Sequence, residues 1–99
     1  MAKVYLSVFK GKDSRNTCWC VLLGCYPTKH EAIVRCREKY EERLKEYEQI
    51  ARDEDVAIDK GEYLDYFEIV CRSCPQEWEE VVIYVKEVEV GKSYYTRLY

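Results

Sequence analysis

The sequence contains no apolar run that approaches the roughly 20 residues needed to span a bilayer. It also shows no secretory signal pattern, because Met1 to Lys12 alternates polar and apolar residues and offers no small-residue cleavage site. We therefore expect no membrane contact and a cytoplasmic location. In that reducing environment the six cysteines are expected to be free thiols.

Residues that commonly carry catalysis are also scarce. The chain has one histidine, His30, and no nucleophile lies near it at a diagnostic spacing. The four glycines are isolated from one another, so the sequence has no glycine-rich loop of the kind that cradles phosphates. These absences predict a protein that is not an enzyme and that needs no cofactor.

The bulk composition is that of an ordinary folded domain. The chain has 99 residues, of which 47% are hydrophobic and 35% are charged. This is enough material for one modest core and too apolar for general disorder. We expect a single domain over residues 1–99.

The first part of the chain predicts a strand hairpin. Residues 4–9 alternate in the two-residue period of a strand, and residues 11–16 are polar and rich in turn formers. Residues 17–25 predict a second strand that is apolar on both faces. A strand with two apolar faces is expected in the centre of a sheet.

A long helix is the clearest predicted element. Thr28 and Glu31 have the spacing of a capping box, in which each side chain satisfies a free amide of the first turn. One apolar stripe follows at helical spacing: Ile33, Cys36, Tyr40, Leu44, Tyr47 and Ala51. We expect the helix to end near Arg52, because anionic residues at 53–55 are unfavourable at its negative C-terminal end.

The last part of the chain predicts further strands. Residues 56–64 fit either a short helix or an ordered loop. Residues 66–72 predict a third strand and residues 81–90 a fourth, whose hydrophobic phase changes near Lys86–Glu87 and predicts a bulge. Residues 94–99 are compatible with a short edge strand.

This order of elements predicts an α+β fold. The elements follow one another as strand, strand, helix, strand, strand. An antiparallel sheet of about four strands, with the long helix packed on one face, buries the apolar stripe.

Charge is distributed unevenly along the chain. Residues 53–80 contain ten acidic and two basic residues, although the net charge of the whole chain is only -3. Tyrosines beside carboxylates make good protein-recognition surfaces, because the ring buries area while the hydroxyl stays hydrogen-bonded. The hypothesis is a docking surface for a basic partner, and the alternative is a solvated acidic surface. The candidate partner-binding residues are Asp53, Asp55, Asp59, Glu62, Tyr63, Asp65, Tyr66, Glu77 and Glu79.

A second hypothesis is the binding of a small anion or nucleotide. Basic residues occur near the predicted hairpin tip and at the helix N-terminus, which favours anions. The candidate ligand-binding residues are either Lys10, Lys12 and Arg15 at the hairpin tip or Lys29 and His30 at the helix N-terminus. Direct nucleic-acid binding is not expected, because the sequence pI is about 5.3 and such binding requires a basic surface. Self-association is left open.

Four cysteines raise the question of a metal site. Cys18 and Cys20, together with Cys71 and Cys74, would supply four thiolates for tetrahedral zinc. The first pair lies on a predicted strand rather than in a turn, and neither pair has the glycine typical of a zinc knuckle. We expect thiols without a metal, and the zinc site remains the alternative.

One short segment carries a resemblance. The run of residues 24–32, with the letters GCYPTKHEA, looks like a strand–cap–helix segment found in many small bacterial and phage proteins. The chain as a whole is similar in size and style to small phage-encoded accessory proteins that inhibit host enzymes, anti-CRISPR proteins among them. This resemblance implies an inhibitor in the host cytoplasm that docks on a basic, nucleic-acid-binding surface of a host protein.

Overall fold

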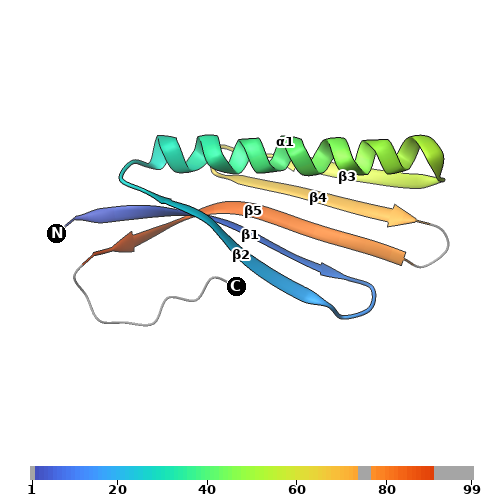
Figure 1. The fold of residues 1–99 in the computed structure, drawn as a ribbon, viewed down its shortest axis with the longest axis horizontal. Coiled ribbons are helices and arrows are strands. Elements are labelled where there is room, and N and C mark those ends of the chain that lie inside the picture. The colour runs from blue at the N-terminus through green and yellow to red at the C-terminus, as the bar shows by residue number, and fades with distance from the viewer. Residues whose placement is uncertain (1, 74–76, 91–99) are drawn as a thin grey trace.

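A single antiparallel sheet and one helix make up the fold of the computed structural model, which describes residues 2–73 and 77–90. The predicted α+β class is confirmed, and Figure 1 shows the helix lying along one face of the sheet. The elements are β1 (Lys3–Asp13), β2 (Cys18–Tyr26), α1 (Lys29–Asp53), β3 (Val56–Glu62), β4 (Tyr66–Ser73) and β5 (Glu77–Glu89).

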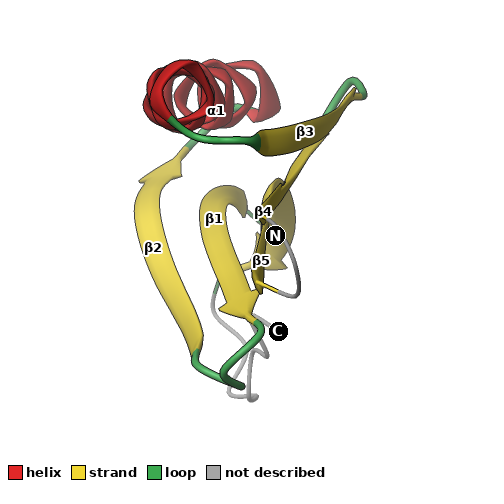
Figure 2. Cartoon of the chain, turned by 90° about the vertical axis from the view of Figure 1, so that its right-hand side faces the viewer, coloured by secondary structure: helices red, strands yellow, loops and turns green. Residues whose placement is uncertain are grey.

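The centre of the sheet is formed by the two longest strands. The spatial order is β2-β1-β5-β4-β3, so β1 and β5 are neighbours although they lie at opposite ends of the chain. They pair without interruption from Lys3 opposite Glu89 to Asp13 opposite Glu79. The helix connects the two edge strands, and Figure 2 shows it seated over the sheet with β2 and β3 on either side.

The helix begins where the sequence predicts. Thr28 has extended backbone angles, its hydroxyl oxygen accepts a hydrogen bond from the Glu31 amide at 3.3 Å, and that hydroxyl donates to the Glu31 carboxylate at 2.9 Å. This differs from the reciprocal capping box, because the carboxylate accepts the hydroxyl proton rather than the backbone amide of Thr28. The helix ends at Asp53, one residue beyond the predicted position.

The core lies between the helix and one face of the sheet. Fully or nearly buried side chains from β1, β4, β5 and α1 form it: Phe9, Cys36, Tyr40, Tyr47, Phe67, Ile69, Val81 and Ile83. The rings of Tyr40 and Phe67 lie 5.1 Å apart between centroids. Because successive strand residues point to opposite faces, the neighbours of these core residues point to the second face, which we call the open face.

The segment 56–64 is a strand for most of its length, so the sheet has five strands and not four. β3 pairs with β4 from Val56 opposite Ser73 to Glu62 opposite Phe67. Ile58 packs against the core, while Asp59 and the residues around it are exposed. The polar residues of this edge strand weaken the strand pattern in the sequence, which explains the ambiguous prediction.

The position of β2 contradicts the prediction for it. β2 lies at an edge of the sheet and not in its centre, because β5 occupies the other side of β1. The predicted bulge near Lys86–Glu87 was wrong as well, since β5 pairs continuously with β1 there. The register shift lies instead in the β1–β2 pairing, where Leu23 is the extra residue. The strand predicted at residues 94–99 lies outside the described residues.

Candidate functional site

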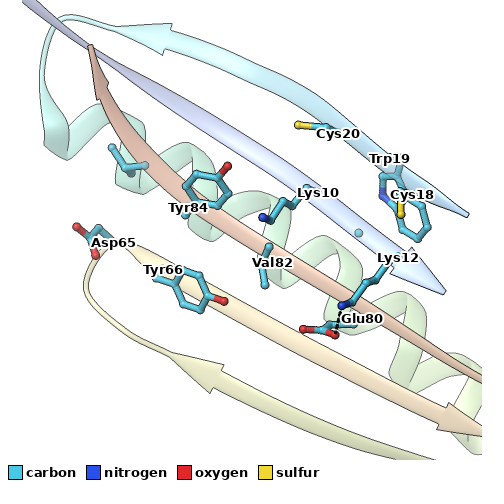
Figure 3. A pocket seen from close by; sticks show the side chains of 12 residues that line it. Lys10, Lys12, Cys18, Trp19, Cys20, Asp65, Tyr66, Glu80, Val82 and Tyr84 are labelled. Atoms are coloured by element: carbon cyan, nitrogen blue, oxygen red, sulfur yellow. Dashed lines mark ion pairs between the residues drawn. The ribbon is translucent and has the colours of Figure 1, made fainter. Parts of the chain in front are cut away.

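The open face of the sheet carries a groove of about 810 Å³. Figure 3 shows Lys10, Tyr66, Val82 and Tyr84 on the side of the sheet away from the helix, which lies behind the sheet in that view. A cavity of this size is typical of small-molecule sites. The lining residues are Lys10, Gly11, Lys12, Cys18, Trp19, Cys20, Asp65, Tyr66, Glu80, Val82, Tyr84 and Val85.

Strand register brings most of these side chains together. Directly opposed residues of an antiparallel pair point to the same face of the sheet. Lys10 is opposite Val82 on β5 and opposite Cys20 on β2, so these three side chains form one row across the groove. Tyr84 is opposite Tyr66 on β4 and forms part of the neighbouring row. The groove is therefore a product of long-range pairing rather than of one sequence motif.

The ammonium group of Lys10 is the cation of this groove that has no carboxylate partner. Its Nζ atom lies 5.7 Å from the centroid of the Tyr84 ring, and it makes no ion pair within the part of the chain that the structure describes. Lys12, by contrast, lies 3.9 Å from the Glu80 carboxylate. Lys10 is thus positioned to meet an anion beside an aromatic surface.

The two tyrosines of the groove remain protonated at neutral pH. Burial raises the pKa of Tyr84, and the nearby Cys20 and Tyr66 add to this effect. Burial also raises the pKa of Tyr66, with further contributions from the negative charges of Glu68 and Glu80. A neutral phenol presents an apolar ring and a hydroxyl donor, and both suit a ligand with a flat body and an anionic group.

Gly11 makes room for the tryptophan at the end of the groove. A Cβ atom at Gly11 would overlap the ring of Trp19, whose backbone is directly opposite. The ring therefore lies over bare backbone, and it also contacts the core, with its centroid 6.5 Å from that of Phe9. A side chain at position 11 would displace the indole from both places.

The candidate ligand-binding residues lie in three places in the fold. Lys10 and Lys12 line the groove, but Arg15 lies in the β1–β2 turn and forms an exposed ion pair with Glu77 at 3.8 Å. Lys29 is 3.1 Å from Asp65, which compensates its charge at the start of the helix. His30 is exposed on the first helical turn and does not line the groove.

The predicted acidic surface is extensively paired within the chain. Basic residues from the turn, the helix and β4 reach five of its seven carboxylates: Arg15–Glu77 at 3.8 Å, Lys29–Asp65 at 3.1 Å, Arg37–Glu62 at 3.7 Å, Arg43–Glu79 at 3.2 Å and Arg72–Asp59 at 3.0 Å. The charge asymmetry along the sequence is thus partly neutralised in space. Asp53 and Asp55 are exposed near the end of the helix and form no ion pair among the described residues.

Glu79 belongs to a structural network rather than to a free surface. The Tyr47 hydroxyl donates a short hydrogen bond to its carboxylate, and Arg43 donates to both groups, at 3.0 and 3.2 Å. Burial and the hydrogen bond to Glu79 raise the pKa of Tyr47. This network fastens β5 to the helix on the covered face.

Two of the candidate partner-binding residues, Tyr63 and Tyr66, lie next to each other. The rings of Tyr63 and Tyr66 lie 5.9 Å apart, and Tyr63 is 59% exposed in the turn between β3 and β4. Tyr66 also lines the groove, whereas the sequence suggested it only as part of a protein-docking surface. Tyr84 and Val82 were missed, because nothing in their local sequence distinguishes the groove from the core.

The cysteines considered for zinc point in different directions. Cys18 and Cys20 line the open face, whereas Cys71 packs against the core on the helix side. Cys74 lies outside the described residues. Three of the four thiols therefore cannot share one tetrahedral site in this fold, and the described residues contain no group of three or more metal-binding side chains.

Comparisons with known proteins yield no relative. No family model, curated protein or solved structure matches this chain. In the described part of the chain, no helix is both long enough and apolar enough to cross a membrane.

Proposed function

We propose that this chain is a non-catalytic binding module that holds a small aromatic anion, of the size of a mononucleotide, in the groove of the open face. The observation that carries the proposal is the position of Lys10, whose ammonium group has no carboxylate partner among the described residues and lies 5.7 Å from the centroid of the Tyr84 ring in a groove of about 810 Å³. The anionic group of the ligand would contact Lys10. The aromatic body would rest on Tyr84, Tyr66 and Val82.

The composition of the groove favours binding over catalysis. The one histidine of the chain lies outside it. The two carboxylates in the lining are both engaged, since Glu80 lies near Lys12 and Asp65 near Lys29. No carboxylate or histidine is therefore left free beside Lys10 among the lining residues, which favours a role in affinity and orientation over proton transfer.

The proposal is tested by comparing adenosine monophosphate with adenosine in a calorimetric titration. Both ligands offer the same aromatic body, but only the nucleotide has an anionic group. Lys10→Met should reduce the affinity for adenosine monophosphate by about tenfold, because a charge-assisted hydrogen bond is lost. The affinity for adenosine should change little.

Arg15→Met is the matched control. Arg15 is a basic residue close in sequence, but it lies in the β1–β2 turn, outside the groove. The variant removes the same charge from the chain and should bind both ligands as the wild type does. If neither ligand binds at millimolar concentration, or if both variants lose affinity equally, the groove is not an anion site.

A second candidate function is docking on a protein with a basic surface, including a host protein that normally binds nucleic acid. What supports it is the exposure of Tyr63 and Leu64, at 59% and 76%, and the absence of ion pairs at Asp53 and Asp55 in the described part of the chain. Exposed charges of this kind accelerate association rather than strengthen the final complex.

This second candidate is tested on a partner isolated from the native host. Reversing Asp53 and Asp55 to lysine should slow association with that partner in low salt and leave dissociation nearly unchanged. Reversal of Asp59 is the control, because its charge is already paired with Arg72. Equal association rates for all three proteins would show that the acidic residues only solvate the surface.

A further inference from the structure

The edge strand β2 carries no charged residue. Its nine residues, CWCVLLGCY, contain no aspartate, glutamate, lysine or arginine, whereas each of the other four strands contains at least two. The opposite edge, β3, contains Asp59, Lys60 and Glu62. Charges on edge strands normally prevent pairing with other chains. The β3 edge therefore has charges that oppose pairing with another chain, and the β2 edge has none.

The outer side of β2 is also open to solvent. Val21 is 45% exposed and Leu22 is 50% exposed, and they lie on opposite faces of the strand. No strand among the described residues pairs with the outer edge of β2. Its outward backbone amides and carbonyls therefore have no strand partner in the described part of the chain, and apolar side chains flank them on both faces.

The sequence of β2 is that of a central strand. Apolar residues on both faces are typical of strands with neighbours on either side. Within residues 2–73 and 77–90, the fold supplies one neighbour for β2, which is β1. A second strand on the outer edge would remove the mismatch between the sequence and the position of β2.

We infer that β2 pairs with β2 of a second copy of this chain. Two antiparallel copies of one strand are related by a twofold axis normal to the sheet, so the two five-stranded sheets would join into one sheet of ten strands. The bulge at Leu23 interrupts the regular strand, which leaves residues 18–22 as the straight segment for pairing.

Charge favours a second copy as the occupant. Each chain has a net charge of -3, so two copies repel one another at long range, and a contact between them adds the least repulsion at a surface that carries no charge. β2 is that surface among the strands, and every antiparallel register of residues 18–22 places uncharged side chains opposite one another. The contact is therefore self-complementary without a charged partner sequence.

The pairing also bears on the groove. Cys18, Trp19 and Cys20 of β2 form one wall of it. Because the twofold axis is normal to the sheet, both helices would lie on one side and both grooves on the other, next to the shared strands. The inference itself does not depend on what the groove binds.

Sedimentation equilibrium from about 10 µM to about 1 mM tests this inference on the whole chain. Wild-type protein should show a monomer–dimer equilibrium within that range. Val21→Lys and Leu22→Lys should each raise the dimer dissociation constant by about tenfold or more, because every substitution appears twice across the twofold axis.

Two controls are matched in residue type and in added charge. Val34→Lys changes a helical valine that is 43% exposed, close to the 45% of Val21, and Leu64→Lys changes a leucine in the β3–β4 turn. Both controls should dimerise as the wild type does. Loss of the dimer in the controls to the same degree would assign the effect to general charge and overturn the inference.

Hydrogen exchange on the wild type provides a measurement that needs no variant. Raising the protein concentration should slow exchange of the β2 amides that point away from β1, and leave the amides of β3 unchanged. A wild type that stays monomeric up to the highest concentration overturns the inference, and so does a dimer that protects residues elsewhere but not in β2.

Discussion

The two faces of this sheet differ in burial and in composition. The covered face packs Phe9, Phe67 and Ile83 against the helix and leaves them 6% exposed or less. The open face presents lysines, tyrosines and thiols around a groove. Both faces come from the same strands, because neighbouring residues point in opposite directions. Stability and binding can therefore be changed independently in this fold, often at adjacent positions.

The largest expected effect belongs to the covered face. Ile83→Ala should lower the free energy of unfolding by about 2–5 kcal/mol, because the side chain is fully buried and its loss leaves a cavity. Val70→Ala changes a partly buried valine of β4 that points to the open face, and it should cost about 1 kcal/mol or less. Urea unfolding measures both. Equal losses would mean that the open face also carries core packing.

A polar contact on the covered face should have the next largest effect. Tyr47→Phe removes the hydroxyl that binds Glu79 and Arg43, and so leaves a partly buried carboxylate with one donor fewer. We expect a loss of about 1–3 kcal/mol. Tyr63→Phe, at an exposed ring, should stay within about 0.5 kcal/mol of the wild type. A neutral Tyr47→Phe would show that this network does not fasten β5 to the helix.

The same tyrosine predicts how stability responds to alkaline pH. Its pKa in the folded protein lies above the ordinary value of 10.0, because of burial and the hydrogen bond to Glu79. A group with a raised folded pKa contributes its full stability below the unfolded pKa and loses it as the pH rises. The free energy of unfolding of the wild type should therefore fall more steeply above pH 10 than that of Tyr47→Phe. Parallel pH profiles in urea unfolding would contradict this assignment.

The covered face was largely predictable from the sequence, and the open face was not. Helical spacing identified Cys36, Tyr40 and Tyr47, all of which are buried in the core. Such periodicity is a local signal, and a single helix must bury its apolar side against the sheet. The groove depends instead on β1 and β5 becoming neighbours, although they are separated by most of the chain. No local pattern contains that pairing.

The candidate sites show the same limit. Lys10 and Lys12 were predicted as ligand-binding residues because of their charge, and the structure places both in the groove. The helix N-terminus, predicted as the alternative anion site, lies outside the groove, and Lys29 there is paired with Asp65. The charge imbalance of residues 53–80 was real, but a count along the sequence could not show that Arg37 and Arg43 of the helix approach those carboxylates.

The smallest expected effect on stability belongs to a residue of the open face, Lys10, and it separates the two faces most clearly. Lys10→Met should leave the free energy of unfolding within about 0.5 kcal/mol of the wild type, because Lys10 has no ion pair to lose in the described part of the chain and its stem is only partly buried. Yet the same variant should abolish most of the stabilisation that adenosine monophosphate gives to the wild type. A ligand that binds only the folded state raises the free energy of unfolding by RT ln(1 + [L]/Kd), so a tenfold loss of affinity removes most of that stabilisation when the nucleotide concentration is about ten times the wild-type Kd. Thermal melts with and without the nucleotide measure both quantities in one series. If Lys10→Met unfolds as easily as Ile83→Ala, the open face is part of the core and the separation between the two faces does not hold.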